Sequence, residues 1–336
     1  MIRTFLLNIF FYIPIWFLKL IFLKKRIPIR GNLFDFQSSV ILSIIPKKDL
    51  SIIPDSSIQE TRELINKKRS EYRLSLKAKN TILRQDHKID TETRTILREY
   101  KPNQIDTDKV ILFFHGGGYV LGSIEGHDHM VSYMSENLRT KFYSLEYSLS
   151  PENKHPIALG EAITAYEWII SNGYNADKIS LCGDSAGAHL AASLVHYLLI
   201  NGGELPSCQL LIYPMCDPAC SSESYELFYE NYLLTKSNMI WFWDKFGNDD
   251  SKMNDPTFNL LKIDTNKKFP KTLIVTAGFD PLCDEAEEYA FLLHKNDNNV
   301  KQLHYPFMFH GFASMTRLKG AHLAVDDFLK EFKKML

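Results

Sequence analysis

Short runs of apolar residues recur along the last two thirds of the chain and predict the strands of a sheet. They lie at residues 94–98, 110–114, 142–147, 179–182, 209–213, 273–277 and 302–305. Several of these runs, such as VILFF at 110–114, are continuously apolar and do not alternate with polar residues. That pattern is typical of parallel strands that are covered on both faces.

Helical patterns separate the strands, at residues 157–171, 186–200, 285–296 and 321–335. Strands and helices that alternate at this spacing predict a mostly parallel, doubly wound α/β sheet. The alternation breaks between residues 214 and 264, where aromatic residues gather: Tyr225, Phe228, Tyr229, Tyr232, Trp241, Phe242, Trp243 and Phe246. We expect a helical cap insert at about 215–264 that covers the site as a lid.

A second cap segment is expected at residues 31–90, before the catalytic domain at 91–336. Residues 59–79 are charged and helix-forming, with few apolar positions, so they predict a surface helix or a helix pair outside the sheet. Together with the insert, this segment would cover the site.

The amino-terminal 30 residues form a separate apolar segment. Residues 5–23 are interrupted only by Asn8, Pro14 and Lys19, and the basic residues 24–26 follow. This length is close to the ~20 residues of a membrane span. A spanning anchor, a helix lying in the membrane interface, a signal peptide and an apolar cap element all remain open. The basic cluster after the run favours a catalytic domain on the cytoplasmic side.

The chain has 336 residues, 45% of them hydrophobic, which suffices for one large α/β domain. Its formal charge of −1 is uneven, because residues 1–101 carry 20 basic and 10 acidic residues while the remainder carries 19 and 30. A basic amino-terminal third suits either solvated charge or an anionic membrane surface. No nucleic-acid-binding motif accompanies it, so we expect no nucleic-acid partner. The five cysteines are an odd number without paired CxxC spacing, which predicts reduced thiols, no disulfide framework and no metal site.

The sequence GDSAG at residues 183–187 follows a predicted strand and precedes a predicted helix. A serine between two glycines at such a junction is typical of a nucleophile elbow, in which the turn is too sharp for neighbouring Cβ atoms. Ser185 is therefore the candidate nucleophile. The helix behind it directs backbone N–H groups, that of Ala186 first, toward an oxyanion.

The glycine-rich loop HGGG at residues 115–118 follows another predicted strand. Its backbone can turn N–H groups toward a substrate oxygen, so we assign Gly116 and Gly117, with Ala186, to the oxyanion hole. His115 would brace the loop. An ordinary tight turn or a phosphate cradle is the alternative, but neither GxGxxG nor GxxxxGK[ST] occurs, and we expect no cofactor.

The general base should lie on a loop after a late strand, and His310 has this position. Asp280 follows the preceding strand and is favoured as the carboxylate that orients the base. Asp284 is its competitor, but capping of the next helix is the simpler explanation for that residue. Among the other histidines, we expect structural roles for His189, His294 and His304, whereas His127 and His129 lie close enough in sequence to the loop to line the pocket.

Six motifs in this order resemble the hormone-sensitive lipase family of α/β-hydrolases, its bacterial esterase branch and its arylacetamide deacetylase relatives. They are residues 115–118, 147–152, 183–187, 211–214, 280–285 and 310–312. The resemblance implies an α/β-hydrolase sheet with a helical cap, the triad Ser185, Asp280 and His310, and oxyanion donors from both glycine-rich motifs. It also implies structural roles for Glu152 and Asp184. Ser148, Ser150 and Cys283 depart from the more usual family residues.

These features predict a serine ester hydrolase that works through an acyl-enzyme on apolar esters with short- to medium-chain or aryl groups. An amidase, a deacetylase or a lipid acyl hydrolase with the same triad is the nearest alternative. A non-catalytic receptor for a small molecule on this fold is a further one. The physiological substrate and the oligomeric state stay open.

Overall fold

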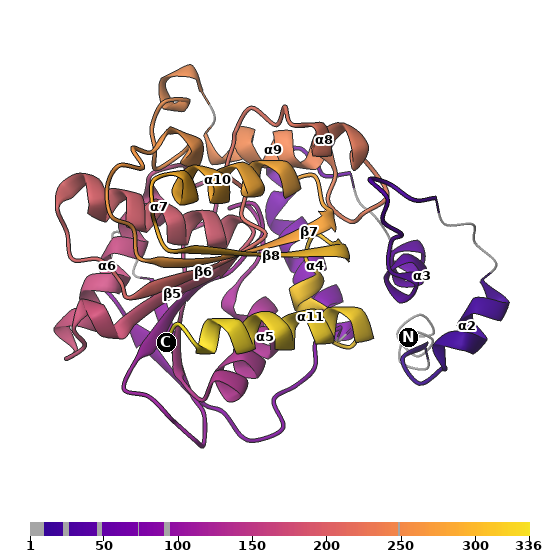
Figure 1. Cartoon of the computed structure of the whole chain (residues 1–336), viewed down its shortest axis with the longest axis horizontal. Helices are drawn as coiled ribbons and strands as arrows, with labels where there is room; N and C mark the ends of the chain where they lie inside the picture. The colour runs from indigo at the N-terminus through magenta and orange to yellow at the C-terminus, as the bar shows by residue number, and fades with distance from the viewer. Residues whose placement is uncertain (1–9, 23–26, 46–48, 73, 91–94, 248) are drawn as a thin grey trace.

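The computed structural model describes residues 10–22, 27–45, 49–72, 74–90, 95–247 and 249–336. An eight-stranded sheet in the order β1-β2-β4-β3-β5-β6-β7-β8 crosses the molecule (Figure 1). The strands are β1 (Leu83–Lys88), β2 (Ile96–Lys101), β3 (Val110–Phe114), β4 (Lys141–Glu146), β5 (Ile179–Asp184), β6 (Cys208–Ile212), β7 (Lys271–Phe279) and β8 (Val300–Phe309). Strands β3 to β8 are parallel, and β2 pairs antiparallel with both β1 and β4. The predicted mostly parallel, doubly wound α/β sheet is confirmed.

Side chains of the central strands point alternately into two apolar clusters. In β3, Leu112 and Phe114 belong to one cluster, whereas Ile111 and Phe113 belong to the other, and all four are fully buried. Both faces of the sheet are therefore covered, as the continuously apolar runs predicted.

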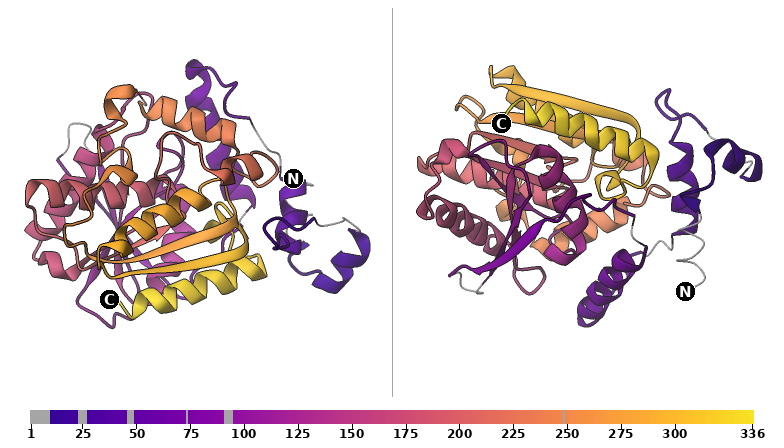
Figure 2. Two further views of the ribbon diagram at one scale, coloured as in Figure 1. Left: turned by 45° about the horizontal axis from the view of Figure 1, so that its top comes forward. Right: turned by 90° about the horizontal axis from the view of Figure 1, so that it is seen from below.

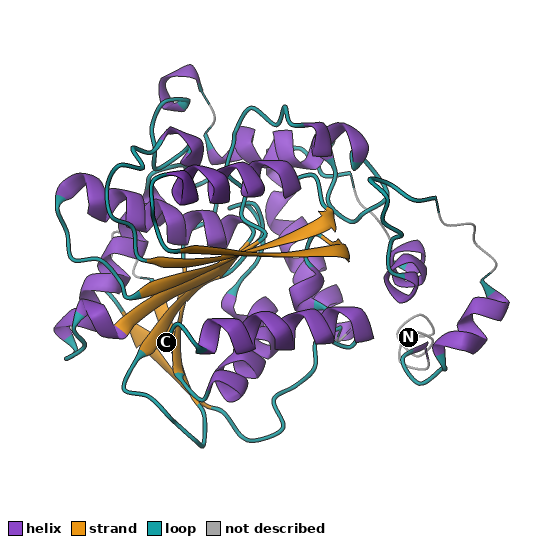
Figure 3. Ribbon diagram, in the orientation of Figure 1, coloured by secondary structure: helices purple, strands orange, loops and turns teal. Residues whose placement is uncertain are grey.

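Helices form a layer on each face of the sheet (Figures 1 and 3). Helices α5 (Ile124–Leu138) and α11 (Lys319–Lys333) pack together on one face. Helices α6 (Ile157–Ser171), α7 (Ala186–Asn201) and α10 (Cys283–Lys295) lie on the other. Four of these helices match the predicted ones closely, whereas α5 was not predicted.

The two predicted cap segments lie toward the end of the molecule at which β7 and β8 finish (Figures 1 and 2). The amino-terminal one contains α3 (Phe36–Ile44) and α4 (Ile58–Tyr72), and the insert contains α8 (Glu223–Leu227) and α9 (Lys236–Phe246). The N–H of Leu50 donates to Asn238 Oδ1 at 2.9 Å, and Lys245 Nζ lies 2.9 Å from Asp55 Oδ1. These two contacts join the segments. Helix α4 ends at Tyr72 and so is shorter than the predicted stretch at 59–79.

Helix α2 (Ile15–Ile21) lies within the apolar amino-terminal run. Residues 1–9 and 23–26, on which the expectation of a membrane segment also depends, lie outside the described residues. Within the described residues, no helix has the length and apolar character required to cross a bilayer.

Candidate active site

The turn between β5 and α7 holds Ser185 in a left-handed backbone conformation, with φ of 56° and ψ of −119°. Its N–H donates to the carbonyl oxygen of Ile212 at 2.8 Å. A Cβ atom at Gly183 would lie 2.2 Å from the carbonyl oxygen of Gly187, and one at Gly187 would lie 2.0 Å from that of Phe114. Only glycine fits at either position, which is the geometry expected of the predicted elbow.

Three side chains from different strand ends meet at this turn. The Oγ of Ser185 lies 2.9 Å from His310 Nε2, and His310 Nδ1 lies 2.8 Å from Asp280 Oδ2. Asp280 is fully buried, and its other carboxylate oxygen accepts the N–H of Leu282 at 2.9 Å. Because a carboxylate accepts at Nδ1, that nitrogen carries the proton, and Nε2 is left to accept the serine hydroxyl.

Asp284, the competing candidate for the orienting acid, is bonded to other partners, whereas Asp280 is bonded to His310. Its two carboxylate oxygens accept Arg30 Nη1 at 2.6 Å and Nη2 at 2.9 Å. The N–H of Ser224 also donates to this carboxylate, at 2.8 Å. Asp284 therefore attaches the cap insert and the amino-terminal segment to the first turn of α10.

The glycine loop after β3 differs from the prediction at Gly116. The N–H of Gly116 donates to Asp184 Oδ1 at 2.9 Å, so it is engaged and does not point freely at a substrate. Within the described part of the chain, the N–H groups of Gly117, Gly118 and Ala186 have no protein acceptor. Gly117 and Gly118 adopt φ of 134° and 61°, which reverses the direction of the backbone after Gly116. The assignment of Gly116 to the oxyanion hole is thus corrected.

Asp184 is buried behind the loop, close to His127 Nε2 at 3.6 Å. Burial alone would raise its pKa, but the charge and hydrogen bond of His127, the N–H of Gly116 and the charge of Arg69 together lower it. The carboxylate is therefore ionised at neutral pH, and it fixes the start of the glycine loop.

His115 is stacked against Tyr147 with 4.2 Å between ring centroids, and the hydroxyl of Tyr147 donates to the carbonyl oxygen of His115 at 2.6 Å. Burial lowers the pKa of His115 to about 3. His115 is thus a neutral ring under the loop, in the bracing position that was expected.

The remaining histidines divide into buried and exposed ones. His189 is fully buried, with Nδ1 2.7 Å from the Tyr119 hydroxyl and Nε2 2.9 Å from the carbonyl oxygen of Phe258. His127 contacts Asp184, as described, whereas His129 is 40% exposed beside Asp128. His294 is exposed on α10, and His304 lies within β8.

Cap side chains rest directly on the loops of the site. The Phe242 ring fills the space next to Gly118, where an added Cβ would lie 2.2 Å from it. Leu233 lies beside Gly311, directly after the histidine. Below the cap, the ring of Tyr213, the residue directly after β6, packs with its centroid 4.7 Å from that of His310.

Arg62 of α4 was not singled out in the sequence, yet it fastens the cap to this region. Its Nε and Nη2 donate to the carbonyl oxygens of Val120 and Ser150, both at 2.7 Å. It also forms a two-bond ion pair with Glu152, at 2.7 and 2.9 Å. The only sequence signal for this contact was the charged residue Glu152 within a motif of the resembled family. No pattern along the chain indicated that Arg62 would be its partner.

Comparison with known proteins agrees with this geometry. The family model described as "alpha/beta hydrolase fold" matches residues 111–314. The chain is 31% identical over 237 residues to "Carboxylic ester hydrolase LipN" of Mycobacterium tuberculosis, a match that covers 68% of this chain and 63% of that protein. It is 29% identical over 228 residues to "Ethyl acetate hydrolase" of Pseudomonas putida, covering 65% of this chain and 71% of the relative.

Among solved structures, a hyperthermophilic esterase from the archaeon Pyrobaculum calidifontis superposes with a TM-score of 0.81 at 27% sequence identity, covering 90% of this chain and 98% of that one. The family match spans more than half of the chain and includes both glycine-rich motifs and Asp280 and His310. The chain therefore belongs to the family with the alpha/beta hydrolase fold, of the hormone-sensitive lipase type that its motifs resemble.

Proposed function

We propose that the protein is a serine carboxylic ester hydrolase that works through an acyl-enzyme. The observation that carries the proposal is the continuous chain of contacts from Asp280 through His310 to Ser185, at 2.8 and 2.9 Å. His310 Nε2 accepts the Ser185 proton as the oxygen attacks the ester carbonyl, and then returns the proton to the leaving alcohol. Water deprotonated by the same nitrogen releases the acid and regenerates the serine.

The negative oxygen formed in each attack needs donors on the opposite side of the carbonyl from His310. We assign the N–H groups of Gly117 and Ala186 to this role, with Gly118 as the next donor in place of Gly116. Each such donor contributes about 3 kcal/mol of barrier lowering in comparable sites. Asp280 keeps the proton on Nδ1 and stabilises the imidazolium.

The cap favours an apolar ester as the substrate. Phe242 lies against the oxyanion loop and Leu233 against the loop that follows His310, so apolar side chains flank the reacting groups from above. The names of the relatives, a carboxylic ester hydrolase and an ethyl acetate hydrolase, support small apolar esters. Short- to medium-chain and aryl esters fit this description.

Turnover of p-nitrophenyl butyrate and labelling by a fluorophosphonate test the proposal. Ser185→Ala should abolish both while far-UV circular dichroism stays unchanged, since the nucleophile is lost and the fold is kept. Ser171→Ala, an exposed serine at the end of α6, is the matched control and should behave like the wild type. Undiminished turnover in Ser185→Ala would refute the assignment, and an inert wild-type protein that binds esters would favour a receptor.

An amidase or deacetylase uses the same three side chains and differs in the leaving group. A paired set of an ester and an anilide with the same acyl group distinguishes the two. We expect kcat/KM to be larger for the ester. A larger value for the anilide would assign the protein to the amidases.

We further propose that the amino-terminal segment associates with a membrane surface. Tyr12, Trp16 and Leu20 expose 84%, 66% and 64% of their surfaces on and beside α2, and they carry apolar or interfacial character. Sedimentation with anionic vesicles should decrease when residues 1–26 are removed, while turnover of a soluble ester is retained because Arg30 and its contacts with Asp284 stay in place. Equal sedimentation of both forms would contradict this proposal.

A further inference from the structure

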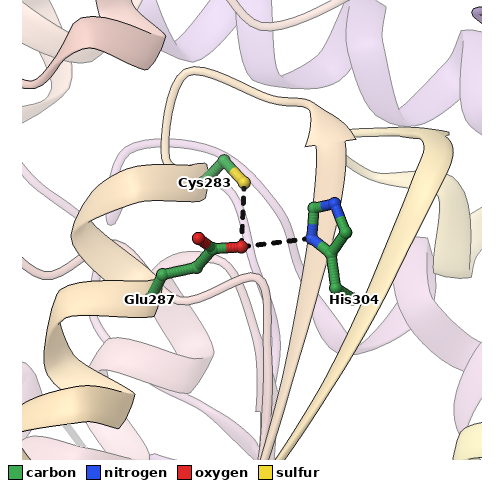
Figure 4. A group of neighbouring side chains, drawn as sticks. All are labelled: Cys283, Glu287 and His304. Atoms are coloured by element: carbon green, nitrogen blue, oxygen red, sulfur yellow. Dashed lines mark hydrogen bonds and ion pairs between the residues drawn. The ribbon is translucent and has the colours of Figure 1, made fainter. Parts of the chain in front are cut away.

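A thiol, a carboxylate and an imidazole converge beside the site on two neighbouring elements. Cys283 begins α10, Glu287 lies one turn further along the same helix, and His304 faces them from β8 (Figure 4). Glu287 Oε1 lies 3.6 Å from Cys283 Sγ and 3.2 Å from His304 Nδ1. All three donor atoms lie within 4.8 Å of one another.

We propose that Cys283, Glu287 and His304 bind one divalent cation of the zinc class. Thiolate, imidazole and carboxylate are the three donor types that such cations select, at bond lengths of about 2.0–2.3 Å. Those lengths need donor atoms within roughly 4 Å of one another, so a movement of about 1 Å completes the site. His304, with 35% of its side chain exposed, has the freedom to make it.

The surroundings of the three donors favour a cation. The carboxylates of Glu287, Asp280 and Asp284 lie close enough to the Cys283 thiol to act on it electrostatically. Their negative charge attracts a metal ion, which replaces the thiol proton. Glu287 is 40% exposed, so water reaches the fourth coordination position.

The contacts around His304 are compatible with coordination through Nδ1. Thr276 Oγ1 lies 2.9 Å from this nitrogen and would exchange that contact for the metal bond. Gln302 Nε2, at 3.2 Å, continues to donate to the threonine oxygen.

The position of the site gives it a structural consequence. Cys283 comes three residues after Asp280, and His304 comes six residues before His310. A bound cation would therefore join the first turn of α10 to β8, the two elements next to the acid and the base. The earlier expectation of no metal site considered only cysteine spacing along the chain, whereas these ligands come together from a helix and a strand.

Cobalt(II) binding to the chelator-treated full chain tests the proposal. The wild type should bind one equivalent with a sulfur-to-cobalt charge-transfer absorption, and its melting temperature should rise. Cys283→Ser should lose that absorption, and Glu287→Gln and His304→Asn should weaken binding at least about tenfold. His294→Gln, an exposed histidine on the same helix, and Cys220→Ser, a buried thiol elsewhere, should bind as the wild type does.

Absence of stoichiometric cobalt binding by the wild type would overturn the proposal. So would unchanged absorption in Cys283→Ser. If Cys283→Ser does not fold, the other two ligand variants decide, because both side chains are partly exposed. Ester turnover measured on the same preparations is independent of this outcome, so failure here leaves the proposed function untouched.

Discussion

Gly116 donates its backbone N–H to Oδ1 of Asp184 at 2.9 Å, across 68 positions of the chain. The carboxylate that directly precedes Ser185 thereby holds the loop to which we assign two of the oxyanion donors. Asp184 does not touch the reacting atoms. It positions the Gly117 and Gly118 N–H groups relative to Ser185.

Asp184→Asn should lower kcat for p-nitrophenyl butyrate about tenfold, with a smaller change in KM. The amide can still accept one hydrogen bond, but the loss of charge weakens that bond by about 1–2 kcal/mol. Steady-state kinetics check this, with the exposed Asp177→Asn as the control. An effect on KM alone would show that the loop stays in place without the charge.

The free energy of unfolding should begin to fall at pH values well above the pKa of the carboxylates. Burial lowers the pKa of His115 and His189 to about 3 and that of His196 to about 4. In the unfolded chain these imidazoles take up protons below about pH 6.5. The unfolded state therefore binds more protons between about pH 6.5 and pH 4, and stability is lost as the pH falls through that window.

Urea unfolding at pH 7.5 and 5.0 measures this loss, expected to be on the order of 1 kcal/mol per pH unit for each imidazole. His196→Asn should make the dependence shallower. The exposed His294→Gln should leave it unchanged. Equal stability at both pH values would contradict the assignment of these rings as neutral and buried.

Gly187→Ala should displace the elbow, because the added Cβ would lie 2.0 Å from the carbonyl oxygen of Phe114. That atom belongs to the backbone of a central strand and cannot move without breaking the sheet. We expect a loss of at least about 3 kcal/mol of stability, or an insoluble protein. Gly160→Ala in α6, with nothing within 4 Å of the new Cβ, should instead stabilise by about 0.5–1 kcal/mol. Chemical denaturation of both variants makes the comparison.

Arg62→Met should loosen the amino-terminal cap segment. The variant leaves the carbonyl oxygens of Val120 and Ser150 without their donor, at a cost of about 2–3 kcal/mol. Limited proteolysis should then cleave near α4 faster than in the wild type. Arg139→Met, whose ion pair with Asp106 is half-exposed at 3.4 Å, is the control and should be cleaved at the wild-type rate.

Local patterns of apolar and polar residues were sufficient to predict most of the strands and helices. Helix α6 has the predicted bounds, since its apolar positions recur at helical spacing. Strand β1 was missed because its sequence, LRQDHK, is almost wholly polar and exposed. The strand exists through pairing with β2 and has no apolar face of its own. Helix α5 carries three charged residues and two histidines among its fifteen positions. Because these residues interrupt the apolar pattern, the buried face of the helix was not recognised in the sequence.

In the candidate site, too, some features were predictable from the sequence and others were not. Ser185, Asp280 and His310 each follow a strand, and a parallel sheet necessarily collects such positions at one edge. The engagement of Gly116 by Asp184 depends on the direction of one N–H bond, which residue types do not encode. The contacts of Arg62 likewise link positions about 60 to 90 residues apart.

The hydrogen bond from Leu50 to Asn238 and the ion pair of Asp55 with Lys245 connect the two cap segments. Because these contacts hold the two segments together, neither segment can move away from the site independently of the other. A bulky ester would have to lift both segments together or enter by rotation of single side chains such as Phe242. We therefore expect the range of ester sizes that the protein accepts to depend on the rigidity of these two contacts as well as on the space around Ser185.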